Sequence, residues 1–277
     1  MPLSIEEFGT HLLDSGDLDP VYVALHALQL PKRQLERWLL AYWCWYDCGV
    51  ASYLSEREGK QFWTVMRSAA LNETTAPSGG RWLRGRERRH ARGAQAVRMV
   101  DELAQRHGAP ENFAAHLDID RKWTCREVMD YAGANYLFGP WISFKVADMA
   151  ERCLGSAVSF DEASTFMFRD PTEAALMLWR ERTRQPPNAL PKSKDHVIRE
   201  VVGYLEGQFG HRAAPPRDDR PVGLQEVETI LCKWKSHVHG KYPPFHDQHD
   251  ILAAIPPWAA TCETAARFQR AVPGWSG

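Results

Sequence analysis

Apolar residues recur at helical spacing through most of this chain, and no segment of useful length alternates apolar with polar side chains. Between residues 32 and 53, for example, Leu35, Trp38, Leu39 and Tyr42 fall on one side of a helix. Strands would need the two-residue alternation that is missing here. The periodicity therefore predicts an all-α protein.

The same periodicity sets the expected order of elements. It predicts helices over residues 21–28, 32–53, 62–71, 94–108, 125–132, 141–154, 170–184, 196–209 and 224–236. Proline, glycine and charged residues predict a basic loop over residues 81–93, a second loop over 185–195, a linker over 213–221 and an irregular stretch over 237–250. We expect one helical catalytic domain over residues 1–277, with residues 222–277 left open as a C-terminal subdomain.

Composition narrows the class of protein. The 277 residues are 25% charged and 44% hydrophobic, which is ordinary for a folded globular chain. Six cysteines without a Cys-x-x-Cys pair favour free thiols in a reducing compartment. No apolar run approaches the roughly 20 residues that cross a bilayer, and the acidic N-terminus lacks a signal-peptide pattern. We therefore expect a cytoplasmic protein with no membrane partner.

Arginine is concentrated in one short segment, although the net charge of the chain is only −1. Residues 81–92 read RWLRGRERRHAR and carry six arginines against one glutamate. Guanidinium groups bind phosphate oxygens in pairs, so a dense cluster suits DNA phosphates or pyrophosphate. The candidate ligands are Arg84, Arg86, Arg88, Arg89, His90 and Arg92. A run of this kind can also be a merely solvated surface.

A tight turn precedes one of the expected helices. Gly139 and Pro140 stand before the helical pattern of residues 141–154, and Asp161 follows twenty residues after Trp141 inside an apolar segment. A glycine–proline pair suits a helix start, because proline is accommodated in the first turn. On its own, this turn indicates only a buried helix entered at Gly139.

The segment YLFGPWISFKVADMAERCLG, residues 136–155, resembles the helix-hairpin-helix of the DNA glycosylase superfamily. The resemblance implies a glycosylase-like helical fold in which a glycine-rich turn and the next helix N-terminus contact a DNA phosphate. Gly139 matches the second glycine of that hairpin. Trp141 falls where some alkylbase glycosylases carry tryptophan and where the lyase members carry their nucleophilic lysine. Asp161 falls at the position of the catalytic aspartate.

Two departures from that hairpin bear on its chemistry. Leu137 replaces the first glycine, and Lys145 lies a full helical turn beyond the position of the lyase lysine, which argues against lyase chemistry. Each candidate also has a structural alternative. Asp161 can cap a helix that begins near Glu162, Trp141 can be a core residue, and Lys145 can either reach a phosphate or only solvate its helix face.

A second resemblance covers most of the chain. Residues 84–97, 138–155 and 224–243 together look like phage proteins of thymidine hypermodification, the amino acid:DNA transferases, also described as α-glutamyl/putrescinyl thymine pyrophosphorylases. That family is understood to share the glycosylase-like fold. It acts on 5-hydroxymethyluracil in DNA that a kinase has pyrophosphorylated. The implied partners are double-stranded phage DNA with this base and a free amino acid, glycine or another, in the cytoplasm of the infected host.

The implied reaction, displacement of pyrophosphate from the 5-methylene carbon by an amino acid nitrogen, makes three physical demands. The base must leave the stack, which Gly139 could support by gripping the backbone and Trp141 by stacking. The leaving pyrophosphate suits the arginine segment. The amine must be neutral to attack, and a carboxylate or a histidine near the reacting carbon could take its proton. Asp161 is the expected proton acceptor, with Lys145 as a second catalytic candidate.

The C-terminal stretch CKWKSHVHGKYPPFHDQHD is also cationic. Lys233, Lys235 and His237 are expected to bind phosphates or the carboxylate of the amino acid. Its several histidines suggest zinc, but their spacing matches no standard finger. We therefore expect no metal site and no cofactor, with Mg²⁺ left open because magnesium often accompanies pyrophosphate chemistry. Asn72 and Glu73, just before the basic loop, are candidates to bind the amino acid's ammonium group.

Three functions fit these residues. The first is the transferase, and it is the one that we expect because the flanking blocks match that family. The alternative enzyme is a DNA glycosylase for a modified or damaged base, with Asp161 supporting an oxocarbenium-like transition state. The third is a phage DNA-binding module without catalysis, in which the arginines are the whole site.

Overall fold

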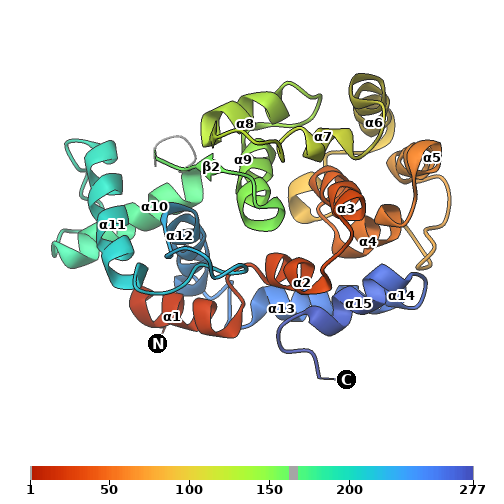
Figure 1. Ribbon diagram of the computed structural model, residues 1–277. Helices are drawn as coiled ribbons and strands as arrows, with labels where there is room; N and C mark the ends of the chain where they lie inside the picture. The colour runs from red at the N-terminus through yellow and green to blue at the C-terminus, as the bar shows by residue number, and fades with distance from the viewer. Residues whose placement is uncertain (1, 162–167, 277) are drawn as a thin grey trace. The chain divides into compact units, whose positions relative to one another are not determined.

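Helices make up most of the computed structural model, which describes residues 2–161 and 168–276 (Figure 1). Within these residues the only sheet consists of two strands of two residues each, β1 (Trp123–Thr124) and β2 (Val158–Ser159). The all-α prediction is therefore confirmed. No helix in the described part of the chain is long and apolar enough to span a bilayer.

The chain divides into two compact units, each assembled from segments that are far apart in sequence. The first unit contains Met1–Pro20 and Ser159–Gln248, and the second contains Val21–Val158 and His249–Gly277. Residues 222–277 are consequently shared between the two units, and the expected linker at 213–221 lies inside the first.

The first unit is built around α12, the helix predicted over residues 224–236. Its helices are α1 (Ile5–Ser15), α10 (Arg169–Arg182), α11 (Lys194–Phe209), α12 (Leu224–Val238) and the start of α13 (His246–Ala254). α12 contacts α1, α10 and α11, and Phe8, Leu205 and Ile230 are fully buried among them. Burial of such apolar side chains stabilises the unit by about 2 kcal/mol each.

Residues 213–221 form an ordered turn rather than the expected linker. The Ala214 N–H donates to the Arg220 carbonyl at 2.8 Å, and the Val222 N–H donates to the Arg212 carbonyl at 2.9 Å. The proline-rich composition suggested a flexible connection, but these hydrogen bonds close the segment on itself between α11 and α12.

The second unit holds the remaining helices. They are α2 (Pro20–Leu28), α3 (Lys32–Trp45), α4 (Cys48–Ser55), α5 (Gly59–Leu71), the 3₁₀ turn η1 (Arg86–Arg88), α6 (Gly93–His107), α7 (Asn112–Ala115), α8 (Cys125–Gly133), α9 (Pro140–Met149), the π-helical turn η2 (Ala150–Leu154), α14 (Pro256–Ala259) and α15 (Glu263–Ala271), together with the end of α13. α3 is buried over most of its length and contacts α4, α7 and α9.

One predicted helix is two helices. The apolar spacing predicts a single helix over residues 32–53, but Tyr46 adopts a left-handed conformation with φ of 52° and ends α3. Asp47 then begins α4, because its Oδ1 accepts the Val50 N–H at 2.8 Å. The prediction was wrong because it followed the apolar spacing and did not weigh Asp47 as an N-cap.

Other helices begin where no helix was expected. α1 starts at a capping box, in which Ser4 and Glu7 accept one another's backbone N–H groups. α13 begins at His246, inside the stretch expected to be irregular, and α14 and α15 follow it. The helix expected over residues 141–154 is confirmed, but its last turn is a π-helix.

Candidate functional site

The connection between α8 and α9 is a short hairpin in the second unit. Leu137, at the position of the missing first glycine, has a left-handed φ of 64°. The Phe138 N–H donates to the Asn135 carbonyl at 3.1 Å, and the Ser143 hydroxyl donates to the Phe138 carbonyl at 3.2 Å. Gly139 then caps α9 with its backbone. The chain therefore turns between α8 and α9 with leucine in the left-handed position.

Two arginines hold the carbonyl oxygens of this hairpin. Arg88 donates from Nη1 to the Leu137 carbonyl at 2.7 Å, and Arg106 donates from Nη1 to the Ala134 carbonyl at 2.6 Å. Arg88 belongs to the arginine segment (residues 81–92), so the segment and the hairpin lie next to each other in one unit. The two features that the sequence suggested separately are thus brought together.

The six arginines of the segment are divided between the interior and the surface. Arg84 and Arg88 are turned inward: Arg84 donates to four carbonyl oxygens, those of residues 69, 70, 82 and 91, and Arg88 donates to the Cys44 carbonyl as well as to Leu137. Burial lowers the pKa of Arg84 to about 10 and lowers that of Arg88. The guanidinium groups of both arginines therefore bind backbone carbonyls inside the protein.

The remaining cations of the segment face solvent. Arg81, Arg86, Arg89 and Arg92 are exposed, and so is His90. Burial against the protein and the charge of Arg88 lower the pKa of His90, so the imidazole is mostly neutral at neutral pH. The exposed arginines that the sequence suggested, Arg86, Arg89 and Arg92, are therefore stronger candidates than His90 for binding phosphate.

Gly85 fixes the path of the segment. Its N–H donates to the Trp45 carbonyl at 2.9 Å, and a Cβ at this position would lie 2.4 Å from the Tyr46 carbonyl oxygen. Only glycine allows so close a backbone approach. The backbone of the segment therefore packs tightly against the end of α3 at Gly85, which lies between the inward-facing Arg84 and Arg88.

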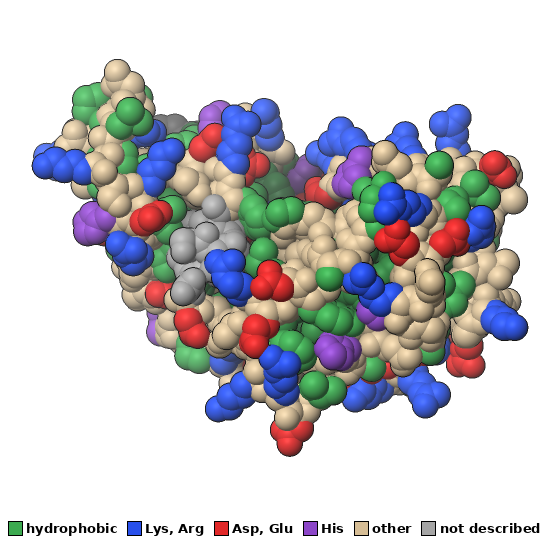
Figure 2. Space-filling model, turned by 90° about the horizontal axis from the view of Figure 1, so that it is seen from above, with side chains coloured by type: hydrophobic (Ala, Val, Ile, Leu, Met, Phe, Trp, Pro, Cys, Tyr) green, Lys and Arg blue, Asp and Glu red, His purple; other side chains and the backbone are tan. Residues whose placement is uncertain are grey.

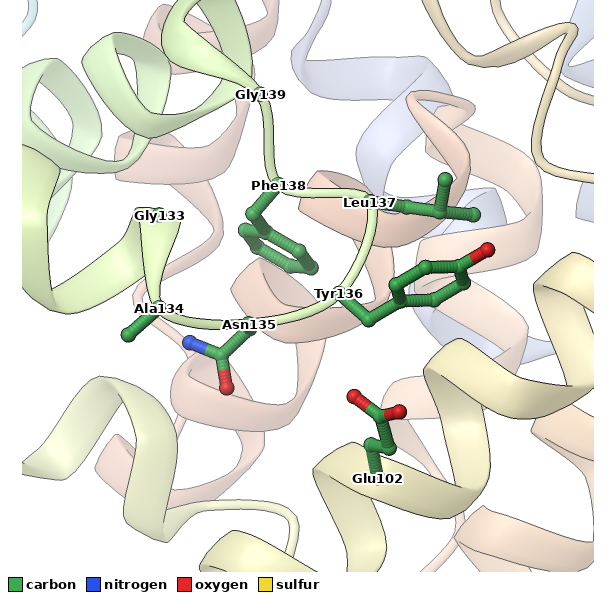
Figure 3. A pocket seen from close by; sticks show the side chains of 8 residues that line it. All are labelled: Glu102, Gly133, Ala134, Asn135, Tyr136, Leu137, Phe138 and Gly139. Atoms are coloured by element: carbon green, nitrogen blue, oxygen red, sulfur yellow. The ribbon is translucent and has the colours of Figure 1, made fainter.

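A shallow cavity of about 460 Å³ opens at the hairpin, lined by residues 133–139 and Glu102 (Figure 3). Tyr136 and Leu137 point to the same side of the hairpin, whereas the Phe138 ring lies inside its curve. The N–H groups of Leu137 and Gly139 donate to no group in the described residues. Two such amides beside a helix N-terminus are suited to an anion.

The hairpin end of α9 has room for a ligand. Gly139 has an ordinary φ of −69°, and a Cβ built on it meets nothing within 4 Å. Trp141 is half-buried, with its ring 5.0 Å from that of Tyr46 in an edge-to-face arrangement. Neither the backbone conformation nor the internal packing explains glycine at position 139.

Lys145 lies in a buried network of charged groups. Its ammonium is 3.2 Å from Asp148 Oδ2, which also accepts the Tyr22 hydroxyl at 2.7 Å, and Arg152 lies 3.7 Å from Asp148 Oδ1. Burial alone would raise the pKa of Asp148, but the charges of Lys145 and Arg152 outweigh it and lower that pKa. Lys145 is thus part of an ion-pair network inside the second unit, and a catalytic role for it stays a prediction.

Asp161 is exposed and lies in the first unit, just after β2. The helix expected to begin at Glu162 falls on residues 162–167, which lie outside the described residues. Catalysis by Asp161 therefore stays a prediction.

The cations of α12 have partners inside the first unit. Lys233 donates to the Asp17 carbonyl and to Asp247 Oδ2, each at 2.7 Å, and Lys235 pairs with Asp170 and Glu173. His237 accepts the Leu3 N–H on Nε2 at 3.0 Å and lies 2.8 Å from the Tyr242 carbonyl on Nδ1. The predicted phosphate contacts of Lys233, Lys235 and His237 stay predictions, but these three side chains already join α1, α10 and α13 to α12.

The candidate amino-acid ligands lie at the end of α5. Asn72 caps this helix in a left-handed conformation, and its Oδ1 accepts the Trp82 N–H at 2.9 Å. Glu73 is exposed. No group of three or more metal-binding side chains occurs among residues 2–161 and 168–276, and the Mg²⁺ question stays open.

Two cations beside the hairpin were missed by the sequence analysis. The Arg98 guanidinium lies 4.1 Å from the centroid of the Tyr136 ring and pairs with Glu102 at 2.7 Å. Arg106 donates a hydrogen bond to the Ala134 carbonyl. The signal was present, since Arg98 and Glu102 are four residues apart on α6 and Arg106 is in its last turn. That helix was assigned only by its apolar face.

Comparison with known proteins places these features in a family. Residues 10–242 match the family model described as amino acid:DNA transferase. The chain is 49% identical over 282 aligned positions to a glycinyltransferase of Pseudomonas phage PaMx11, covering 98% of this chain and 96% of the relative. It is 24% identical to a putrescinyltransferase of Delftia phage PhiW-14, covering 81% of this chain and 69% of that relative. This chain therefore belongs to the amino acid:DNA transferase family and is a transferase.

Proposed function

We propose that this enzyme joins the nitrogen of glycine to the 5-methylene carbon of pyrophosphorylated 5-hydroxymethyluracil in phage DNA and releases pyrophosphate. Glycine as the donor is supported by 49% identity to a phage glycinyltransferase. The identity of the modified base is inferred from the resemblance of the arginine segment, the hairpin and α12 to the thymidine hypermodification proteins. The three segments lie within or overlap the matched residues 10–242.

The reaction balances without an oxidant or a cofactor. The neutral amine attacks the methylene carbon, a C–N bond forms, and the C–O bond to pyrophosphate breaks. Pyrophosphate leaves with the electron pair of that bond, and the extra proton on nitrogen passes to a carboxylate. We assign the role of proton acceptor to Asp161. Lys145 is assigned a structural role, because it forms an ion pair with Asp148 on the same helix.

The contact between Arg88 and Leu137 is the observation that supports the DNA site. It places the arginine segment beside a hairpin whose amides at Leu137 and Gly139 are available for a phosphate. On the face drawn in Figure 2, Lys and Arg side chains are interspersed with Asp and Glu. Because the net charge is only −1, attraction for DNA has to come from local groups of this kind.

The proposed roles follow from which groups are accessible. Arg86, Arg89 and Arg92 bind the pyrophosphate or neighbouring DNA phosphates, and the Gly139 amide binds the DNA backbone. Trp141 offers a ring on which a base can stack once the target nucleotide leaves the duplex. Glu73 is retained as the candidate for the ammonium group of the donor.

A single assay tests this function. The enzyme is incubated with duplex DNA that contains pyrophosphorylated 5-hydroxymethyluracil and with isotope-labelled glycine, and the digested nucleosides are weighed. We expect a nucleoside that carries glycine and one equivalent of released pyrophosphate. Putrescine and glutamate, supplied separately, test the choice of donor.

The other outcomes separate the competing functions. Abasic sites without glycine incorporation would indicate a glycosylase. Transfer of putrescine or glutamate in preference to glycine would contradict the proposed donor but not the reaction. DNA binding without any change in nucleoside mass would leave only a binding module.

A further inference from the structure

The loop between α10 and α11 carries the most exposed large hydrophobic side chain in the described residues. Leu190 is 80% exposed, whereas the next, Ile119, is 46% exposed. Full burial of a leucine side chain stabilises a protein by about 2 kcal/mol. Leu190 obtains little of this stabilisation, because most of its surface faces solvent. No contact within the first unit accounts for leucine at this position.

Hydrogen bonds hold the loop in one conformation. The Gln185 N–H donates to the Arg180 carbonyl, and the Ala189 N–H donates to the Pro186 carbonyl, each at 2.9 Å. The Arg180 guanidinium reaches across the loop and donates to the Ala189 carbonyl at 2.9 Å. Leu190 therefore stands directly after a turn that is braced from α10.

Cations flank the exposed leucine within the loop, and the nearest acidic residues along the chain, Glu181 and Asp195, border the loop at its two ends. Residues 182–194 read RTRQPPNALPKSK and contain four cations and no acidic residue. Arg184, Lys192 and Lys194 are exposed and form no ion pair among the described residues, unlike the paired Lys235 of the same unit. The loop is thus a local positive surface on a chain with a net charge of −1.

We propose that this loop, residues 184–194, is a second DNA contact of the transferase. Arg184, Lys192 and Lys194 bind phosphates on both sides of a groove, and Leu190 packs against the sugars and bases between them. The inference rests on DNA as the family's substrate and does not depend on which base is modified.

The size of the apolar surface favours DNA over other partners. One leucine is far smaller than the roughly 800 Å² that each partner of a stable protein–protein interface buries. An interfacial membrane anchor needs a whole apolar helix face. A single apolar side chain between phosphate-binding cations is instead the arrangement by which side chains insert at a base step.

Binding of unmodified duplex DNA tests the proposal separately from catalysis. Fluorescence anisotropy across a salt series is measured for Leu190→Ala, for the double variant Lys192→Ala with Lys194→Ala, and for Ile119→Ala as the control. Ile119 is exposed but lies between Asp118 and Asp120, so it should not meet DNA. Thermal unfolding confirms that all three proteins are folded.

The two loop variants should weaken DNA binding in different ways. The lysine variant should lower the slope of log affinity against log salt by about 2, since each lost phosphate contact removes about 0.9. Leu190→Ala should weaken binding by about threefold to tenfold with an unchanged slope, because it removes no charge. Ile119→Ala should match the parent.

Two results would overturn the proposal. One is affinity and slope within twofold of the parent for both loop variants. The other is binding of the parent, but not of the loop variants, to vesicles of anionic phospholipid while their DNA affinity is unchanged. Either result would leave glycine transfer untouched, because the assay uses no modified base.

Discussion

The guanidinium group of Arg88 donates a hydrogen bond to the carbonyl oxygen of Leu137 at 2.7 Å. The side chain is 1% exposed and its other hydrogen bonds go to the Cys44 carbonyl and the Met99 sulfur. Arg88 therefore joins α3, α6, the arginine segment and the hairpin. One arginine of the run thus has a structural role, whereas its exposed neighbours are the proposed DNA contacts.

Replacement of Arg88 should damage the fold, and replacement of its neighbour Arg89 should not. Arg88→Ala removes the donor to the buried Cys44 carbonyl and to the partly buried Leu137 carbonyl and opens a cavity, so we expect a loss of about 3 kcal/mol in the free energy of unfolding. Arg89→Ala, at an exposed position, should change stability by less than about 0.5 kcal/mol. Urea denaturation measures both, and equal stabilities would contradict the structural role of Arg88.

The exposed arginines should control the salt dependence of DNA binding. Changing Arg86, Arg89 and Arg92 to alanine together removes three phosphate ligands, so the slope of log affinity against log salt should fall by about 2 to 3. Anisotropy with unmodified duplex DNA measures the slope. The matched control replaces Arg33 and Arg270, which are exposed in the same unit. An identical fall in the control would mean that net charge alone is responsible.

Gly139→Val should separate binding from folding. The position has an ordinary φ and empty space around it, so stability should change by less than about 1 kcal/mol. A branched side chain should nevertheless keep a DNA phosphate away from the hairpin amides and weaken binding by about tenfold or more. Gly85→Ala is the contrasting variant, because its Cβ would collide with the Tyr46 carbonyl and should unfold the segment. Unchanged DNA affinity in Gly139→Val would remove the hairpin from the interface.

The ionised carboxylate of Asp148 should add to the free energy of unfolding at neutral pH, and this contribution should be lost in acid. Its folded pKa lies below the ordinary value, because Lys145 and Arg152 outweigh the cost of burial. Its contribution is therefore complete above the unfolded pKa of about 3.9 and is lost as the pH falls through the lower folded pKa. Asp148→Asn should cost about 3 kcal/mol at pH 7.

The difference in free energy of unfolding between Asp148→Asn and the parent should be smaller near pH 3 than at pH 7. Urea denaturation at pH 7 and near pH 3 compares the two proteins. A deficit that does not shrink at low pH would show that the carboxylate charge is not the source of the stability.

Asp161→Asn tests the proton acceptor. Without a carboxylate the attacking amine cannot lose its proton to this residue, so turnover of glycine should fall by about a hundredfold or more, while DNA affinity stays at the parent value. Asp120→Asn, also exposed, is the control and should retain full turnover. Full activity of Asp161→Asn would assign the base to another residue.

The helices were predictable where apolar spacing was regular, and their ends were predictable only where a cap was weighed. α5, α6, α8 and α12 follow from spacing alone. The break at Tyr46 and Asp47 has a local signal, the aspartate N-cap, that the long apolar pattern concealed. The short helices α14 and α15 offer few turns of periodicity, which explains why they were missed.

The arginine segment shows what composition cannot tell. The six arginines are chemically alike in sequence, and five of them were candidates for phosphate binding. Which of them turn inward depends on the tight path at Gly85 and on the carbonyl groups that end α3 and α5. Those contacts join residues more than ten positions apart along the chain, so no local pattern encodes them.

The close approach of Gly85 to Tyr46, together with the four carbonyls held by Arg84, has a thermodynamic consequence for recognition. Ordering one free residue costs about 1–2 kcal/mol of backbone entropy, and this segment incurs that cost when the chain folds rather than when DNA arrives. Its outward guanidinium groups are attached to a backbone that is already ordered, so formation of the DNA complex costs little further backbone conformational entropy. Association should therefore be fast, with no slow conformational phase after the first encounter.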